Sequence, residues 1–212
     1  MNPTHESPDD VMTMLIADYA ATPDSSAYDV FDDVLAVRRT VRSFADVPLD
    51  KALLDAVLAA GDRIDRRLFA EDRRACGRLE TLVVTRAVTG MPAGVHTITA
   101  DSGREFHGPL PESAWQSIQM TPEMCTAPVL IVPAGNLDAA HRAFGGPGHL
   151  RMRRRAGAVA HAMWLAALEA GLAGGIVGAI RPNRDFRRIA VLDPLRRSPL
   201  LALAIGRPKE VL

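Results

Sequence analysis

Arg38-Arg39-Thr40-Val41-Arg42-Ser43-Phe44 places three guanidinium groups and two hydroxyls within seven residues. The stretch follows an amphipathic run at 30–35 and precedes Pro48, so we expect it where one helix ends and another is about to begin. Guanidinium groups are planar, forked donors that suit phosphate and carbonyl oxygens. The stretch therefore predicts an anion cradle. The alternative is a solvated helix C-terminus, where cations complement the helix dipole.

The amino-acid composition limits the number of domains and the classes of partner that we expect. The chain has 212 residues, enough for one domain with a sizeable core, and its 25 basic residues balance 25 acidic ones. This balance provides no global field for nucleic acid or an anionic membrane, and we expect neither as a partner. Residues 1–27 are polar and rich in Asp, Ser and Pro, which predicts an N-terminal extension ahead of one folded domain over 28–212.

Cysteine usage and the N-terminus predict a cytoplasmic setting. Cys76 and Cys125 form neither a disulfide framework nor a metal-ligand spacing, which favours a reducing compartment. Residues 2–10 are polar and acidic, without the charged and apolar regions of a signal peptide. The apolar run 156–180 is long enough to span a membrane, but four glycines interrupt its second half. We interpret it as a buried helix followed by a buried strand.

Hydrophobic periodicity predicts an α+β fold, with a central mixed β-sheet surrounded by long helices. Strands are expected over 79–87, 95–99, 127–132, 174–180 and 200–205, the first two forming a hairpin. Helices are expected over 28–37, 50–61, around Trp115, and over 150–171 and 183–192. No Gly-x-Gly-x-x-Gly follows a strand, which argues against a Rossmann nucleotide site.

The predicted 150–171 helix begins with a run of arginines, namely Arg151, Arg153, Arg154 and Arg155. Cations at a helix start oppose the helix dipole, so this run is unfavourable unless it meets an anion. The alternative is a solvated face. On the same helix, Ala156, Ala160 and Ala167 form a stripe of small residues that would permit another helix to approach closely.

The histidines predict no metal site, because their spacings match no ligand signature. His161 lies on the apolar stripe of the long helix, where we expect a hydrogen-bonded core role. His149 lies in the glycine-rich stretch before that helix and is the better candidate for a substrate-facing acid or base. Ser-His-Asp hydrolysis lacks the Gly-x-Ser-x-Gly elbow that would support it.

Four stretches in order resemble the nitroreductase superfamily, covering about residues 28–210. The first is the arginine stretch, which resembles the family's Arg-Arg-Ser-x-Arg-x-Phe signature and is likewise followed by a proline and a helix. The others are the long helix with Ala156-Gly157, the segment Gly175-Ile176-Val177-Gly178-Ala179, and the terminal Leu203-Ala204-Ile205-Gly206-Arg207-Pro208. The resemblance implies a homodimer that holds FMN at its interface, and it would put the small-residue stripe close to the two-fold axis.

The resemblance also implies roles for individual residues. Arg38 and Thr40 would face the flavin N1/C2=O edge or the ribityl chain, with Arg39 beside them, while Arg42 with Arg207 or Lys209 would hold the phosphate. A backbone N–H within Val177, Gly178 and Ala179 would address the flavin N5. Cys76 and Gly77 stand where the family often has Ser-Gly beside the ring; the alternative for Cys76 is a buried, inert thiol.

Within the superfamily, the region of Gly157, His161 and Val177-Gly178-Ala179 is most similar to the azoline dehydrogenase and cyclic dipeptide oxidase branch. The resemblance implies a dehydrogenase that oxidises a peptide- or amino-acid-derived substrate and passes electrons to oxygen. The Lys-Tyr pair usual in azoline dehydrogenases is absent near Arg142-Ala143-Phe144-Gly145, which favours another amino-acid-derived substrate. Two alternatives are an NAD(P)H-dependent nitro or quinone reductase and a non-catalytic relative that serves as a partner subunit.

Overall fold

An antiparallel sheet organises the folded part of the chain. The computed structural model describes residues 36, 38–98, 103–118, 124, 126–178, 180 and 182–209. The chain divides into two units, Met1–Arg38 and Arg39–Leu212, and the sheet with its helices belongs to the second. The expected extension over 1–27 and nearly all of the helix expected over 28–37 lie outside the described residues.

Within the described part the sheet has seven strands, in the order β3-β2-β1-β4-β7-β5, with β6 paired to β4. The strands are β1 (Glu80–Thr85), β2 (Gly94–Ile98), β3 (Arg104–Gly108), β4 (Val129–Gly135), β5 (Ala173–Val177), β6 (Ser198–Pro199) and β7 (Ala202–Gly206). All ladders between them are antiparallel. Parallel pairing occurs among the described residues as the isolated bridges Thr40–Gly174 and Leu49–Val88, so the expected mixed character comes from these bridges.

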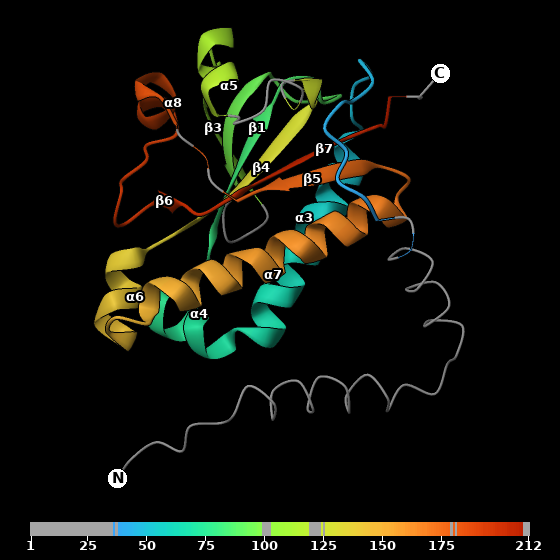
Figure 1. The fold of residues 1–212 in the computed structure, drawn as a ribbon. Helices are drawn as coiled ribbons and strands as arrows, with labels where there is room; N and C mark the ends of the chain where they lie inside the picture. The colour runs from blue at the N-terminus through green and yellow to red at the C-terminus, as the bar shows by residue number, and fades with distance from the viewer. Residues whose placement is uncertain are drawn as a thin grey trace. The chain divides into compact units, whose positions relative to one another are not determined.

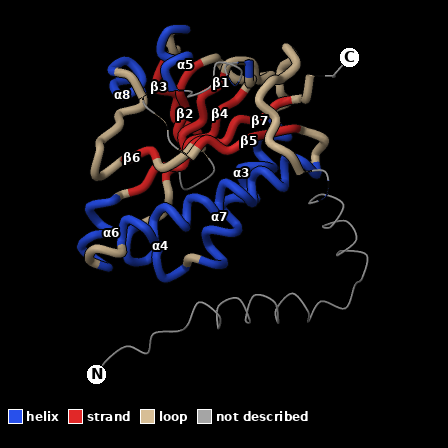
Figure 2. Tube along the Cα trace, in the orientation of Figure 1, coloured by secondary structure: helices blue, strands red, loops and turns tan. Residues whose placement is uncertain are grey.

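Helices cover both faces of the sheet (Figures 1 and 2). They are α3 (Lys51–Leu68), α4 (Ala70–Cys76), α5 (Glu112–Ile118), α6 (Leu137–Phe144), α7 (Gly148–Glu169) and α8 (Arg184–Ile189). Helices α3 and α7 bury Leu54, Val159 and Met163 with Val83 and Ile131 of the sheet in one core. On the other face, α5 and α8 contribute Trp115, Ile118 and Phe186 to a second core. The predicted α+β class is confirmed.

Helix α3 begins where its cap predicts but ends later than expected. The Asp50 carboxylate accepts a hydrogen bond from the Ala52 backbone N–H, which satisfies one of the helix's first donors. The sequence predicted an end near Gly61, yet the helix continues to Leu68. A Cβ on Gly61 would lie 2.7 Å from Cγ of Met163, so this glycine lets α3 and α7 approach closely instead of ending the helix.

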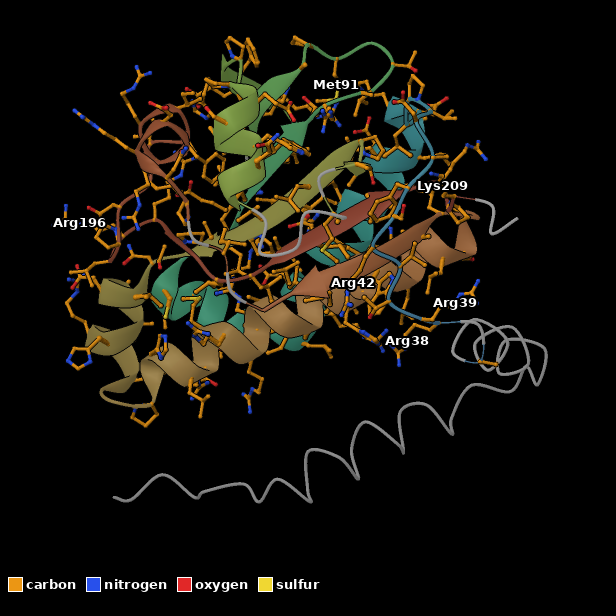
Figure 3. The ribbon with its side chains drawn as sticks, turned by 45° about the horizontal axis from the view of Figure 1, so that its top comes forward. Arg38, Arg39, Arg42, Met91, Arg196 and Lys209 are labelled. Carbon is orange, nitrogen blue, oxygen red and sulfur yellow. The ribbon has the colours of Figure 1, made fainter. Side chains whose placement is uncertain are left out.

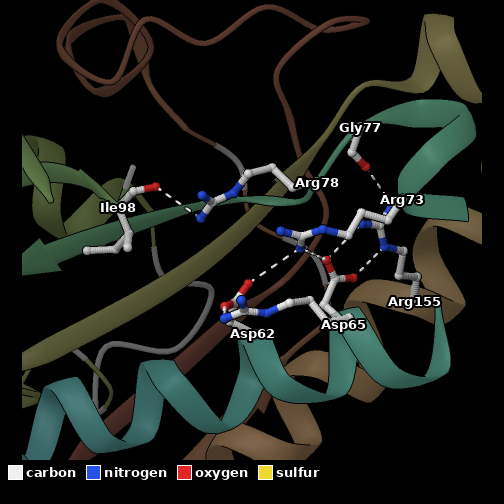
Figure 4. A network of polar contacts seen from close by, with 8 residues as sticks. Asp62, Asp65, Arg73, Gly77, Arg78, Ile98 and Arg155 are labelled. Atoms are coloured by element: carbon white, nitrogen blue, oxygen red, sulfur yellow. Dashed lines mark hydrogen bonds and ion pairs between the residues drawn. The ribbon is translucent and has the colours of Figure 1, made fainter. Parts of the chain in front are cut away.

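Carboxylates of α3 and α4 meet the arginines at the start of α7, and Figure 4 shows the contacts of Asp65 on α3 with Arg155. The Arg155 side chain is fully buried, and its Nε and Nη2 donate to the two oxygens of Asp65 at 2.5 and 2.8 Å. Its Nη1 donates to the Gly77 carbonyl at 2.9 Å. Arg151 donates to Asp72 at 2.6 Å. The Asp65 and Asp72 carboxylates therefore supply the anions that the arginine run needs. Arg154 is exposed, as the alternative interpretation of a solvated face predicted.

Stability should decrease on mild acidification because His96 is buried beside Thr85. Desolvation lowers the His96 pKa, with His107 acting in the same direction and the Pro92 carbonyl opposing it. The unfolded chain therefore binds this proton at a higher pH, near 6.5, than the folded chain does. We expect the free energy of unfolding to decrease as the pH is lowered from about 7.5 through 6.5. In urea titrations across this range, the free energy of unfolding should decrease less for His96→Gln than for wild type. His141→Gln, at an exposed position, should show the same decrease as wild type.

Candidate functional site

The arginine stretch is attached to one corner of the sheet, where β5 begins and β7 ends. Thr40 forms a bridge with Gly174 of β5, and the Val41 N–H donates to the Gly174 carbonyl at 2.9 Å. Phe44 forms a bridge with Pro208, directly after β7, and the Ala45 N–H donates to the Arg207 carbonyl at 3.0 Å. The two ends of the folded unit, far apart in sequence, thus meet at this corner (Figure 1).

Four cations gather at this corner, namely Arg39, Arg42, Arg207 and Lys209, and all four are exposed. No ion pair among the described residues joins any of them to a carboxylate. Figure 3 shows Arg42 and Lys209 on the same side of the unit. Such unpaired guanidinium and ammonium groups suit an anion with several oxygens. Arg38 belongs to the other unit, and is also exposed.

The edge strand β5 extends from this corner. Gly175 packs so tightly that a Cβ would lie 2.7 Å from Cε of Met124 and 3.0 Å from Cγ2 of Thr40. Farther along the strand, Val177 is half-buried and Gly178 is exposed. From Gly174 to these residues the edge extends about 10–13 Å, at about 3.3 Å per residue. The edge thus connects a cationic corner to exposed backbone groups. Ala179 lies outside the described residues.

Cys76 and Gly77 lie elsewhere in the unit, at the N-terminal half of α7. Cys76 is buried, and the Gly77 carbonyl accepts from Arg155. Burial raises the pKa of the Cys76 thiol, as does the Asp72 carboxylate, while the Arg155 and Arg151 guanidinium groups lower it. A raised pKa keeps the thiol protonated and unreactive, in line with the alternative interpretation of an inert cysteine. One copy of the chain does not bring this pair together with Arg42.

The two candidate histidines lie differently from expectation. His149 is exposed in the first turn of α7 and accepts from Nε of Arg153 at 2.9 Å. It precedes Trp164, the residue of α7 that packs against Gly174, by about 22 Å along the helix axis. The core role expected for His161 is wrong, since His161 is exposed. Its ring contacts Trp164 edge to face, with centroids 6.1 Å apart.

The stripe of small residues on α7 serves a different purpose from the one predicted. Ala156, Ala160 and Ala167 are each 0% exposed and pack in the core that α7 shares with α3 and the sheet. They are therefore not available to a second copy, and this part of the prediction is wrong. The face that turns away from the core carries Ala158, Ala162 and Leu165 instead.

Sequence reasoning did not identify three residues that support the corner. Thr126 accepts from the Phe44 N–H at 3.0 Å, Met124 packs against Gly175, and Trp164 packs against Gly174. Two adjacent glycines at a strand start could have indicated such close neighbours, but not which residues they are. The described residues contain no group of three or more His, Cys, Asp or Glu side chains that could hold a metal ion. None of their helices combines the length and apolar character that crossing a membrane requires.

Comparisons with known proteins show what this chain is similar to. Residues 117–207 match the nitroreductase family model. A candidate nitroreductase of Methanocaldococcus jannaschii is 29% identical over 189 residues, covering 84% of this chain and 91% of that protein. A candidate nitroreductase structure from Anabaena variabilis has a TM-score of 0.69 at 16% identity, and 83% of this chain spans 37% of that one.

Two further structures share the fold. A candidate nitroreductase from Desulfovibrio desulfuricans, solved in complex with FMN, has a TM-score of 0.54 at 19% identity, covering 84% of this chain and 86% of that one. A chain of the Escherichia coli microcin synthetase McbBCD complex, with truncated pro-MccB17 bound, has a TM-score of 0.65 at 14% identity, covering 79% and 68%. The family match and the M. jannaschii relative make part of this chain similar to nitroreductases, and the solved structures show that the fold is shared.

Proposed function

We propose that the chain is an FMN-dependent dehydrogenase that acts on a peptide- or amino-acid-derived substrate and uses oxygen as electron acceptor. The observation that carries the flavin assignment is the corner where Thr40 meets Gly174 and Phe44 meets Pro208, with exposed cations from both chain segments. The FMN phosphate has two negative charges to satisfy, and this corner offers cations without carboxylate partners among the described residues.

The residues at the corner fit FMN. Arg42 with Arg207 and Lys209 would hold the phosphate, and Arg39 and Thr40 lie beside β5 to donate toward the ribityl chain or the N1/C2=O edge. The exposed backbone near Val177 and Gly178 would meet the N5 side of the ring. When bound, FMN supplies hydride acceptance and electron transfer to oxygen. The chain's own part is to anchor the phosphate, orient the ring along β5 and exclude water from one of its faces.

The preference for a dehydrogenase over a reductase rests on the similarity of Gly157, His161 and Val177-Gly178 to the peptide-modifying branch. The fold shared with a chain of the microcin synthetase complex supports this preference. The absent Lys-Tyr pair favours a cyclic dipeptide or another amino-acid-derived substrate over an azoline. An NAD(P)H-dependent nitro or quinone reductase is the second candidate, because the chain is similar to the M. jannaschii candidate nitroreductase. A cytoplasmic location fits either activity.

Anaerobic stopped-flow mixing with NADH or NADPH separates the two candidates. For a dehydrogenase that draws its electrons from another substrate, we expect the flavin absorbance to bleach more slowly than about 1 s⁻¹, the lower end of ordinary turnover. Bleaching above that rate would identify the ordinary reductase. A protein that binds FMN but is reduced neither by nicotinamides nor by candidate dipeptides would favour the non-catalytic partner subunit.

We also infer a homodimer formed through the outward face of α7. A different protein as a further partner subunit is compatible with this arrangement. Ala158, Ala162 and Leu165 are partly exposed there, and their small or apolar side chains allow a second helix to pack. Light scattering should give a mass near twice 22.8 kDa. Leu165→Glu should shift the mass toward the monomer. The exposed Arg142→Glu change on α6 should not, and a wild-type monomer that binds FMN fully would contradict the dimer.

A further inference from the structure

His161 lies on the side of α7 that turns toward β5. Trp164 marks that side, since its indole Cδ1 would lie 3.0 Å from a Cβ on Gly174. The opposite side is marked by Met163 and Val159, which pack against Gly61 of α3. Residues three apart on a helix are separated by about 60° around its axis and residues four apart by about 40°, so His161 lies between the Trp164 side and Leu165 on the outward face. The edge-to-face contact between the two rings agrees with this placement.

The position of His161 along the helix is also informative. α7 ends at Glu169, and β5 begins at Ala173 after a short turn, so the two elements run in opposite directions. Trp164 is level with Gly174. Going from Trp164 to His161 moves about 4.5 Å along the helix, and going from Gly174 to Val177 moves about 10 Å in the same direction along the strand. His161 is therefore beside the middle of the β5 edge, where the proposed flavin ring would lie.

His149 has no such placement. It precedes His161 by about 18 Å along the helix, near the end of α7 that packs against α6 and pairs with Asp72 of α4. His161 is therefore better placed than His149 to act as the acid or base that the sequence predicted. An exposed histidine beside a predicted ring edge can exchange a proton with a bound substrate at neutral pH.

We propose that His161 is the catalytic base for the dehydrogenation, an inference that rests on the proposed function. In a substrate with adjacent C–H and N–H bonds, the C–H bond breaks and its electron pair leaves as hydride to the bound flavin. The N–H proton passes to the His161 imidazole and from there to water. A C=N double bond remains in the product, so electrons and protons balance. The neutral imidazole is the active form, and its protonation stops the reaction.

A pH titration of the bound flavin tests this proposal without a substrate. On α7 itself, Arg154 and Arg155 precede His161 in sequence and Glu169 follows it, while Arg39 and Arg42 flank the Thr40–Gly174 bridge at the start of β5. Among the side-chain types, histidine is the one whose ordinary pKa lies between pH 5 and 8. The second phosphate pKa, near 6, belongs to the far end of the cofactor. A step in ring absorbance near pH 6.5 would therefore report a histidine beside the ring.

The experiment uses the full chain loaded with FMN. We expect the wild type to show this step, His161→Gln to lose it while binding FMN within about threefold of wild type, and His149→Gln to keep it. Thermal unfolding of each variant controls for folding. A step that persists in His161→Gln, or a flavin-loaded wild type without a step, would overturn the role of His161 and leave the proposed function standing. If the wild type binds no FMN, the proposed function itself is wrong.

Discussion

Asp65→Ala should lower the free energy of unfolding by about 3–5 kcal/mol. The change leaves the Arg155 guanidinium without its carboxylate at a position where Arg155 is 0% and Asp65 3% exposed. An uncompensated buried charge is costly because water cannot replace the lost partner. Asp65 also accepts from Arg73 at 2.8 Å, so the substitution removes ion pairs that join α3 to both α4 and α7. Urea denaturation followed by circular dichroism measures the loss.

Two further variants make this result specific. Lys51→Ala removes an exposed ion pair of similar length, 2.8 Å, with side chains 47% and 41% exposed, and should cost less than about 1 kcal/mol. The double change Asp65→Leu with Arg155→Met removes both charges and should be less destabilising than Asp65→Ala alone. A loss below about 1 kcal/mol for Asp65→Ala would show that the pair does not hold these helices together.

Arg42→Ala should weaken FMN binding by roughly ten- to a hundredfold. A charge-assisted hydrogen bond is worth about 1.5–3 kcal/mol, and each 1.4 kcal/mol corresponds to a factor of about ten in affinity. Arg42 is exposed at the corner between β5 and β7, so its replacement should leave the core unchanged. Fluorescence titration of FMN into the flavin-free protein gives the dissociation constant for each variant.

Arg196→Ala is the matched control for this titration. Arg196 is 78% exposed in the turn between α8 and β6, far from Arg42 in Figure 3. Both changes remove one exposed guanidinium and the same net charge. Equal weakening by the two variants would indicate a general charge effect and not a phosphate contact. A higher salt concentration should reduce the difference in FMN dissociation constant between wild type and Arg42→Ala, because screening weakens exposed charge contacts.

Strong periodicity predicted the core elements well. The long helix expected over 150–171 is α7 at Gly148–Glu169, and the hairpin expected from 79–99 is β1 paired with β2. The resemblance to the nitroreductase superfamily implied that the first and last stretches lie together, and the Phe44–Pro208 bridge joins them. This bridge and the Thr40–Gly174 bridge are long-range pairings, which no local pattern of residues specifies.

The missed elements have physical reasons. No strand was expected over 103–111, which is rich in glycine and proline, yet β3 forms there because the edge of β2 pairs with it from Arg104 to Gly108. No helix was expected over 137–144 either, because α6 is short and its Asn136 cap was not recognised. Periodicity also found the small-residue stripe of α7 but could not tell which neighbour it meets. The chain's own α3 and sheet cover that stripe.

The absorption spectrum of the 212-residue chain, incubated with FMN and separated from free flavin by gel filtration, is the decisive test of the flavin assignment. We expect an oxidised-flavin band that coelutes with the protein at one FMN per chain. We also expect Arg42→Ala to retain much less flavin after the same column than wild type and Arg196→Ala do. A colourless wild-type protein, with all of the FMN in the small-molecule fraction, would contradict the assignment of the Thr40–Gly174 corner as a flavin site.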